Sequence, residues 1–155
     1  MLIGTMVSWM KELYIEYAES LSEIAEAKMS AGHDKYESER GIDINFKNIS
    51  FVLTNKSGDV FGVIKAYAAY AEIYVEDLWV DESLRNNGYG RKLLNYLEEH
   101  VQGQNYNNIN LVTNQFQAPD FYKKCGYEVE FVRVNKKNEK LTKIFFIKYL
   151  WVFLE

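Results

Sequence analysis

A short glycine-containing loop joins a predicted strand to a predicted helix, and it limits what this chain can fold into. Residues 85–91 read Arg-Asn-Asn-Gly-Tyr-Gly-Arg; a strand pattern ends before them at Val80, and apolar residues recur with helical spacing after them. Glycines permit a tight turn that leaves successive N–H groups pointing outward at a helix N-terminus, where the helix dipole adds positive charge. The loop predicts a phosphate-binding site; the simpler alternative is that Asn-Asn-Gly only forms a turn.

Two common phosphate-binding loops do not match this segment. No Lys-Ser or Lys-Thr pair follows the glycines, as a Walker A loop requires, and Leu93 stands where the dinucleotide fingerprint has its third glycine. A nucleoside triphosphate or a nicotinamide cofactor is therefore disfavoured. Arg85, Arg91 and Lys92 add full positive charges near the loop, which favours an anionic ligand of another kind.

The remaining hydrophobic patterns predict a sheet covered by helices. Strands are expected at residues 49–55, 60–70, 72–80 and 109–113, and a closing hairpin at residues 127–134 and 143–153. A helix with a buried stripe of Leu93, Leu94, Leu97 and Val101 should end near Gly103, and a short helix should run from Pro119 to Gly126. This order predicts an α/β (α+β) fold with a mixed sheet and helices on both faces.

The N-terminal part of the chain carries a helical pattern of its own. Leu13, Tyr17, Leu21 and Ile24 fall on one face and glutamates follow another, so an amphipathic helix is predicted over residues 11–29. Residues 31–41 are polar and break this period, which predicts a loop or a short second helix.

Length, charge and cysteine content bound the class of protein. The chain of 155 residues fits one domain, 1–155. It has 18 Lys and Arg against 22 Asp and Glu, and the resulting net charge of −4 disfavours nucleic acid as a partner. Cys125 is the only cysteine, so an internal disulfide is excluded, and neither it nor the two histidines predicts a metal site. No signal peptide or membrane span is indicated, and we expect a cytoplasmic protein.

Two motifs about 30 residues apart resemble those of the Gcn5-related N-acetyltransferase (GNAT) family. The family's acetyl-CoA motif, Arg/Gln-x-x-Gly-x-Gly/Ala after a strand ending in an apolar-x-Val, is matched by Leu78, Val80, Arg85, Gly88 and Gly90. Its second motif, Ala-x-x-x-Tyr-x-x-x-Gly-aromatic, is matched by Ala118, Tyr122, Gly126 and Tyr127. The resemblance covers roughly residues 42–150.

This resemblance implies a mostly antiparallel sheet whose strands splay apart to admit acetyl-CoA. The backbone of Leu78, Trp79 and Val80 would pair with the pantetheine arm. The CoA diphosphate would be bound by the loop residues Arg85, Asn86, Asn87, Gly88, Tyr89, Gly90 and Arg91. The family carries out direct acetyl transfer and needs no metal ion.

The same resemblance implies roles for three side chains. Glu76 would remove the amine proton, and Asp77 would attract a cationic substrate, with the alternative that one of the two is only a solvated carboxylate at a strand end. Tyr122 matches the general acid, because a phenol stays protonated at neutral pH and can donate to a departing thiolate. Cys125 lacks an evident histidine partner and is interpreted as a packing residue.

Two departures from the family pattern are visible. Gln115 stands where an asparagine is common seven residues before the tyrosine, and only residues 1–6 are available for the usual first edge strand.

The predicted function is N-acetylation of a primary amine on a small cationic molecule, polyamine-like or aminoglycoside-like. A protein N-terminus or lysine is the alternative acceptor, and a non-catalytic CoA-binding regulatory module is the alternative of another class. The apolar C-terminal stretch, residues 145–154, suggests a homodimer formed through the last strand.

Overall fold

The computed structural model describes residues 13–150 of a chain that divides into two compact units, Met1–Gly41 and Ile42–Glu155. Each unit is described by itself below. Residues 1–6, the only segment available for the family's first edge strand, lie outside the described residues, and organisation as one domain stays a prediction.

The first unit contains a single described helix, α1, at Glu23–Ser38. The Ser22 hydroxyl accepts a hydrogen bond from the Ala25 N–H at 3.2 Å. Glu23 lies in the first turn, where its negative charge interacts favourably with the helix dipole. The predicted boundaries were wrong: the helix begins later than residue 11 and continues through the segment expected to break it. The apolar residues whose spacing suggested an earlier start are not buried: Leu13 and Tyr17 are 93% and 92% exposed.

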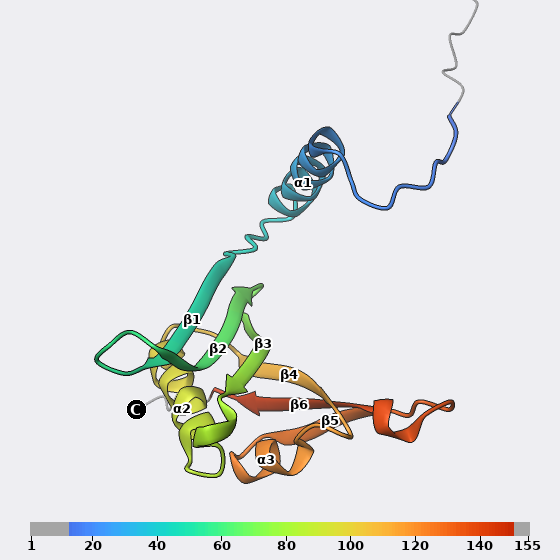
Figure 1. The fold of residues 1–155 in the computed structure, drawn as a ribbon. Coiled ribbons are helices and arrows are strands. Elements are labelled where there is room, and N and C mark those ends of the chain that lie inside the picture. Colours follow the sequence, from blue (N-terminus) through green and yellow to red (C-terminus); the bar gives the residue numbers. More distant parts are fainter. Residues whose placement is uncertain (1–12, 151–155) are drawn as a thin grey trace, which may run out of the picture. The chain divides into compact units, whose positions relative to one another are not determined.

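The second unit is built on a six-stranded sheet (Figure 1). Its strands are β1 Lys47–Thr54, β2 Val60–Ala69, β3 Glu72–Val80, β4 Asn108–Asn114, β5 Glu128–Arg133 and β6 Lys143–Tyr149, in the order β1-β2-β3-β4-β6-β5. Only the β3–β4 pair is parallel. The predicted mixed, mostly antiparallel sheet is therefore confirmed, and both expected hairpins are present.

The hairpin turn between β1 and β2 is made by the residues that predicted it. The Asn55 side-chain oxygen accepts hydrogen bonds from the N–H groups of Ser57 and Asp59, and Gly58 adopts a φ of +88°. An asparagine that bonds the backbone two residues on is a common way to begin a turn. Local chemistry thus determines where β1 ends.

Two longer helices and two short 3₁₀ turns complete the second unit. Helix α2 is Tyr89–Val101 and helix α3 is Pro119–Lys124, while the 3₁₀ turns lie at Glu82–Leu84 and Glu139–Leu141. Proline occupies the first turn of α3, where its missing N–H costs no hydrogen bond. The predicted apolar stripe of α2 is buried, as expected, and contacts β1, β2 and β3.

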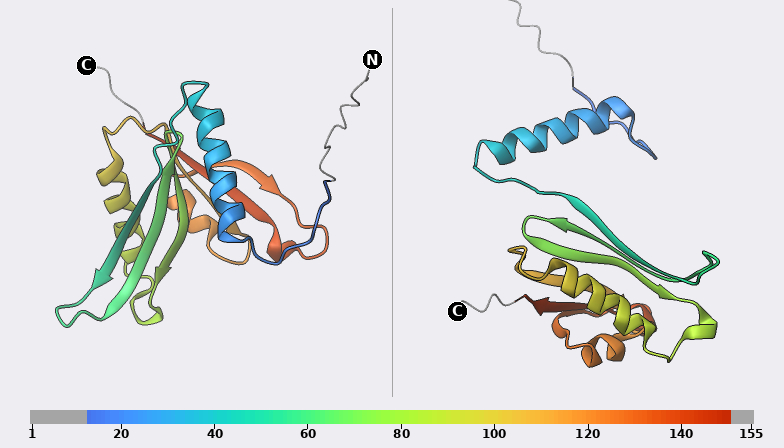
Figure 2. Two further views of the ribbon diagram at one scale, coloured as in Figure 1. Left: turned by 90° about the horizontal axis from the view of Figure 1, so that it is seen from above. Right: turned by 90° about the vertical axis from the view of Figure 1, so that its left-hand side faces the viewer.

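Both helices of this unit lie on one face of the sheet (Figure 2). Gly62 of β2 lies against Leu93 of α2, while the ring of Tyr122 in α3 is 5.7 Å from that of Phe146. Gly62 shares its face of β2 with Ala66, which is aligned with Phe146 across the intervening strands. Helices therefore cover one face within this unit, and α1 belongs to the other unit.

The hydrophobic core lies between that face and the two helices. Its buried members are Ile64, Ala66, Ala68, Ile73, Val75, Leu93, Leu94, Leu97, Val101, Ile109, Leu111, Tyr127, Ile144 and Phe146. Burial of this many apolar side chains is the main source of the unit's stability.

The last described strand, β6, is not at an edge of the sheet. It pairs with β4 on one side and β5 on the other. Because both of its edges are occupied, residues 143–149 cannot add a strand from a second copy, so the proposed route to a dimer is wrong for this strand. A homodimer formed in another way stays a prediction.

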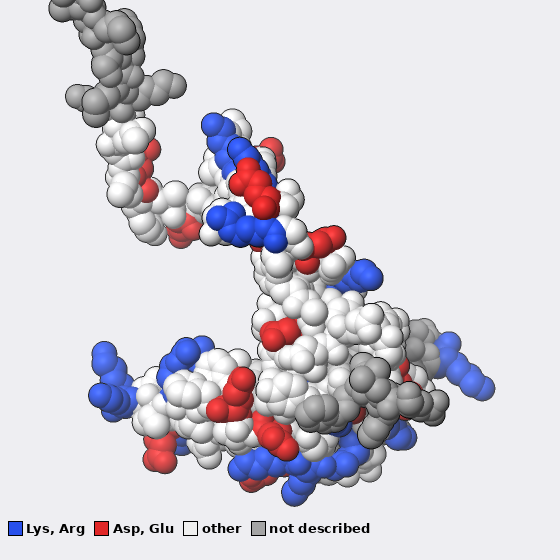
Figure 3. All heavy atoms as spheres, turned by 180° about the vertical axis from the view of Figure 1, so that it is seen from behind, with Lys and Arg blue, Asp and Glu red and all other residues white. Residues whose placement is uncertain are grey.

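The surface of the second unit carries charges of both signs. Seen from behind, basic and acidic side chains both occur on it, and neither sign dominates the face shown (Figure 3). Among residues 13–150, no helix combines the length and the apolar character that crossing a membrane needs.

Candidate functional site

The site begins where strand β3 separates from β4. The two strands pair only from Glu72 to Val75, opposite Asn108–Leu111, although both continue further. At the same point Lys65 of β2 pairs with Asp77, while the next residue of β2 pairs with Val75, so Glu76 is an extra residue in a β-bulge. Within residues 13–150, the main chain from Glu76 to Val80 therefore has no ladder partner on the β4 side.

The glycine loop follows β3 and presents unpaired amides. Gly88 adopts a φ of +81°, a conformation that favours glycine, and the first backbone hydrogen bond of α2 runs from the Lys92 N–H to the Gly88 carbonyl at 3.0 Å. No N–H from residue 86 to residue 91 has an acceptor among the described residues. With the dipole of α2 behind them, these donors form the anion-binding geometry that the loop predicted.

The side chain of Arg85 links the glycine loop to the end of strand β3. Its Nε donates a hydrogen bond to the Val80 carbonyl at 3.1 Å, and the Asn87 side-chain amide donates to the Arg85 carbonyl at 3.0 Å. The loop is therefore held by its own side chains, while its amides remain available.

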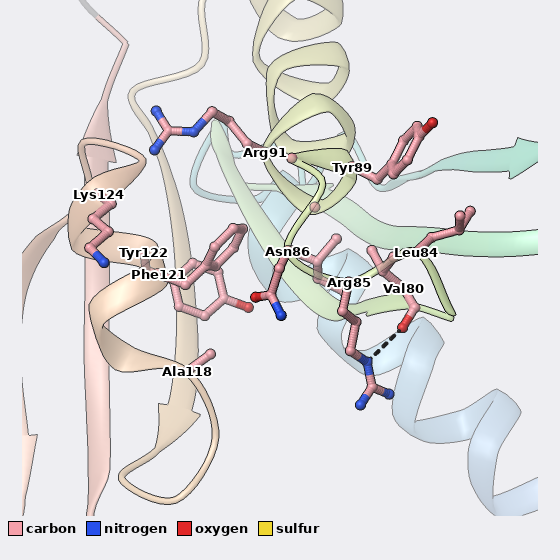
Figure 4. Close-up of a pocket in the computed structure, with 13 residues that line it drawn as sticks. Val80, Leu84, Arg85, Asn86, Tyr89, Arg91, Ala118, Phe121, Tyr122 and Lys124 are labelled. Carbon is pink, nitrogen blue, oxygen red and sulfur yellow. Dashed lines mark hydrogen bonds between the residues drawn. The ribbon is translucent and has the colours of Figure 1, made fainter. Parts of the chain in front are cut away.

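A cavity of about 450 Å³ lies in front of these amides (Figure 4). It is lined by Leu78, Val80, Leu84, Arg85, Asn86, Gly88, Tyr89, Gly90, Arg91, Ala118, Phe121, Tyr122 and Lys124. Most of the predicted cofactor-binding residues are in this set, together with the predicted acid. Trp79 and Asn87, which were also predicted, do not line it.

Phe121 forms part of the cavity wall where α2 and α3 approach each other. A Cβ atom added to Gly90 would lie 3.1 Å from Cζ of Phe121, which is tighter than ordinary contact. The absence of a side chain at Gly90 thus leaves room for Phe121 at the start of α2. Motif spacing in the sequence does not show that Phe121 lies against α2, because it does not reveal which helix lies opposite.

Tyr122 lies on α3 with its ring among other aromatic residues and its edge on the cavity. Its ring centroid is 5.1 Å from that of Phe121 and 6.2 Å from that of Tyr127. Burial, together with the smaller effects of the charges of Cys125 and Asp77, raises the pKa of Tyr122 to about 12. The phenol is therefore protonated at neutral pH and can act as a proton donor.

The two candidate carboxylates lie at the bulge and do not line the cavity. Glu76 forms an ion pair with Lys65, with 3.0 Å between Oε2 and Nζ, whereas Asp77 forms no ion pair among the described residues. Asp77 is close enough to Tyr122 for its charge to raise the pKa of the phenol. Lys65 was not predicted as a site residue, since only the strand register brings it to the bulge.

A partly buried ion pair holds the end of α3 in place. Lys148 Nζ lies 2.7 Å from Oε2 of Glu98 on α2 and also donates to the carbonyl of Cys125 at 3.2 Å. The Tyr127 hydroxyl donates to the other oxygen of Glu98 at 3.2 Å. These contacts join α2, α3 and β6 behind the cavity, and they link residues too distant in sequence to be predicted.

The surroundings of Cys125 favour its protonated form. Burial raises the pKa of the Cys125 thiol, although Arg91 nearby opposes the shift, so the thiol is a poor nucleophile at neutral pH. Within residues 13–150, no group of three or more His, Cys, Asp and Glu side chains could hold a metal ion.

Comparison with known proteins places these features in one family. The model described as "Acetyltransferase (GNAT) family" matches residues 10–127. A crystal structure of an acetyltransferase from Bacillus cereus ATCC 14579 shares 29% sequence identity at a TM-score of 0.73, covering 89% of this chain and 100% of that one. No curated protein is similar enough in sequence to count as a match.

Two further solved structures share the fold. An aminoglycoside 6'-acetyltransferase type Ii has 25% identity and a TM-score of 0.60, with 83% of this chain and 82% of that chain covered. An aminoglycoside 6'-N-acetyltransferase complexed with coenzyme A has 18% identity and a TM-score of 0.60, covering 92% of this chain and 100% of the other.

Proposed function

Because this chain belongs to the acetyltransferase (GNAT) family, we propose that it acetylates a primary amine of a small cationic molecule. Acetyl-CoA is the acetyl donor of the family, and the enzyme class is that of acetyl-CoA-dependent N-acetyltransferases. The acceptor and the roles of individual side chains are the proposed part.

The observation that carries the proposal is the row of unpaired amides from residue 86 to residue 91, which opens on a cavity bordered by Tyr122. The amides and the dipole of α2 suit a diphosphate. The free edge of β3 beyond Val75 suits an extended pantetheine arm, because its unpaired backbone groups can bond it as a neighbouring strand would. An acyl-CoA thus matches the donors that this chain leaves unsatisfied.

A cationic acceptor is supported by the acidic pair at the bulge. Glu76 and Asp77 are both exposed, lie next to each other and stand at the point where the strands separate. One protein of similar fold is an aminoglycoside 6'-acetyltransferase type Ii, which supports an aminoglycoside-like acceptor here. Polyamine-like and aminoglycoside-like amines are the candidates.

The reaction needs two proton transfers besides the attack itself. The neutral amine nitrogen attacks the acetyl carbonyl carbon, a C–N bond forms and the C–S bond breaks. Glu76 takes the proton that the amine loses, and Tyr122 donates a proton to the departing thiolate. The raised pKa of Tyr122 keeps that proton in place until it is needed, and no covalent enzyme intermediate is involved.

The test is release of free thiol from acetyl-CoA with a panel of amines, alongside calorimetric binding of CoA. The panel contains polyamines, aminoglycosides and peptides with a free N-terminus or a lysine. Turnover with the small cations supports the proposal. Turnover on peptides alone would make the chain a protein acetyltransferase, and CoA binding with no turnover on any amine would make it a regulatory module.

A further inference from the structure

Two basic side chains at the cavity have no acidic partner. Arg91 comes from the first turn of α2 and Lys124 from the end of α3, and both line the cavity. Neither forms an ion pair among the described residues, whereas the adjacent Lys123 pairs with Asp120 at 3.5 Å. Figure 4 shows Arg91 and Lys124 on the same side of the cavity, away from Arg85.

The positive charge of Arg91 does not stabilise α2 at this position. The first turn of a helix favours negative charge, yet the first turn of α2 contains no acidic residue and carries Arg91. The positive charge of Arg91 also reaches the α3 side of the cavity, since it acts to lower the pKa of the Cys125 thiol. Both side chains are exposed and line the same cavity, so an anion bound there would be attracted by both positive charges.

Acetyl-CoA has a second anionic group besides its diphosphate. The amides of residues 86–91 suit the diphosphate, which leaves the 3′-phosphate of the ribose without a binding group. We propose that Arg91 and Lys124 bind this 3′-phosphate, and that the enzyme thereby distinguishes CoA from 3′-dephospho-CoA. This inference rests on the proposed function.

A second cavity of about 450 Å³ between β1 and α2 is the competing location for the nucleotide. It shares Tyr89 with the first cavity and contains one basic side chain, Lys92, whose Nζ already lies 4.9 Å from the centre of the Tyr89 ring. A phosphate dianion is better matched by two unpaired cations than by one that already contacts an aromatic face. The first cavity is therefore favoured.

The test compares the binding of CoA and 3′-dephospho-CoA by calorimetry in the full-length protein. The wild type should prefer CoA by about tenfold or more, the factor that a charge-assisted hydrogen bond to phosphate contributes. Arg91→Gln with Lys124→Gln should reduce the preference to near onefold, because the affinity for CoA should fall much further than the affinity for 3′-dephospho-CoA, which keeps its contacts to the amides of residues 86–91. Lys123→Gln is the matched control and should keep the wild-type preference.

Each other outcome has a definite meaning. A wild type that binds both ligands equally, or a double variant that retains the tenfold preference, shows that Arg91 and Lys124 do not bind the phosphate. Loss of the preference in Lys92→Gln instead places the nucleotide in the second cavity. A wild type that binds neither ligand overturns the proposed function itself. Circular dichroism and thermal midpoints establish that each variant is folded. If the single variant Lys124→Gln loses the preference for CoA, Lys124→Arg, which keeps the positive charge, should restore it.

Discussion

At the scale of single residues, the site depends on where each charge and proton is held. Tyr122 has a pKa raised to about 12 mainly by burial, while Glu76 and Asp77 lie outside the cavity at the bulge. The two carboxylates differ in their surroundings, because only Glu76 has a cationic partner, Lys65. Neighbouring acids of the same charge can therefore have separate tasks.

Tyr122→Phe removes the proposed proton donor and little else. We expect kcat to fall by about 10²-fold or more, the range typical of losing a general acid, while the affinity for CoA stays within about twofold. Steady-state kinetics and calorimetry measure the two quantities. Phe121→Leu serves as a control for disturbed packing of α3, and an unchanged kcat in Tyr122→Phe would contradict the assignment.

Glu76→Gln and Asp77→Asn should have different kinetic signatures. Loss of the proposed base lowers kcat, whereas loss of a charge that only attracts the cation raises KM with kcat retained. We expect the first effect for Glu76→Gln, by about 10²-fold, and the second for Asp77→Asn. Both are measured at saturating acetyl-CoA; reversed signatures would show that Asp77, which is near enough to affect Tyr122, is the base.

At the scale of elements, the cavity is made by the contact between α2 and α3. Gly90 allows α2 to approach Phe121, and the Glu98–Lys148 ion pair joins α2 to the C-terminal end of α3. Each helix could be predicted from its own sequence, through the apolar stripe of α2 and the proline of α3. Their approach could not, because a hydrophobic period shows which side of a helix is buried and not what lies against it.

Gly90→Ala tests this approach directly. The added methyl group meets Phe121 at 3.1 Å, so we expect a loss of about 1–3 kcal/mol in the free energy of unfolding and weaker CoA binding. Urea denaturation and calorimetry measure both. Adding Phe121→Leu makes room for the methyl group and should recover part of the loss, and purely additive effects of the two substitutions would show that the contact is not the cause.

At the scale of the whole molecule, several tyrosines are held protonated by the folded second unit. Burial raises the pKa of Tyr122 to about 12 and also raises that of Tyr127, where the charge of Glu98 adds to the effect. The hydrogen bond to Glu72 raises the pKa of Tyr74 to about 12. Since an unfolded tyrosine has a pKa near 10, the folded state binds these protons more tightly than the unfolded state does.

Stability should therefore decrease in alkaline solution. This contribution is complete below about pH 10 and is lost as the pH rises from about 10 to about 12, because the unfolded phenols ionise first. Urea denaturation at a series of pH values measures the slope. Tyr127→Phe should make the dependence of stability on pH shallower, whereas Tyr96→Phe, at a side chain that is 61% exposed, should leave it unchanged. Equal slopes in the wild type and Tyr127→Phe would contradict the linkage between tyrosine ionisation and stability.

The sequence by itself determined the features that depend on near neighbours. The glycine loop at the start of α2, the turn at Asn55 and the strand patterns of the sheet follow from backbone preferences and local hydrogen bonds, which act over a few residues. Where local signals conflicted, prediction failed: the apolar spacing after Leu13 suggested a helix, while the Ser22 cap determined its actual start.

Only the tertiary structure decided which distant side chains meet. Strand register brings Lys65 to Glu76 at the bulge, and the placement of β6 between β4 and β5 brings Lys148 to Glu98. Arg91 and Lys124 line one cavity because α2 and α3 share a face of the sheet. Contacts of this kind depend on how whole elements pack together, and a periodic pattern in sequence carries no information on that choice.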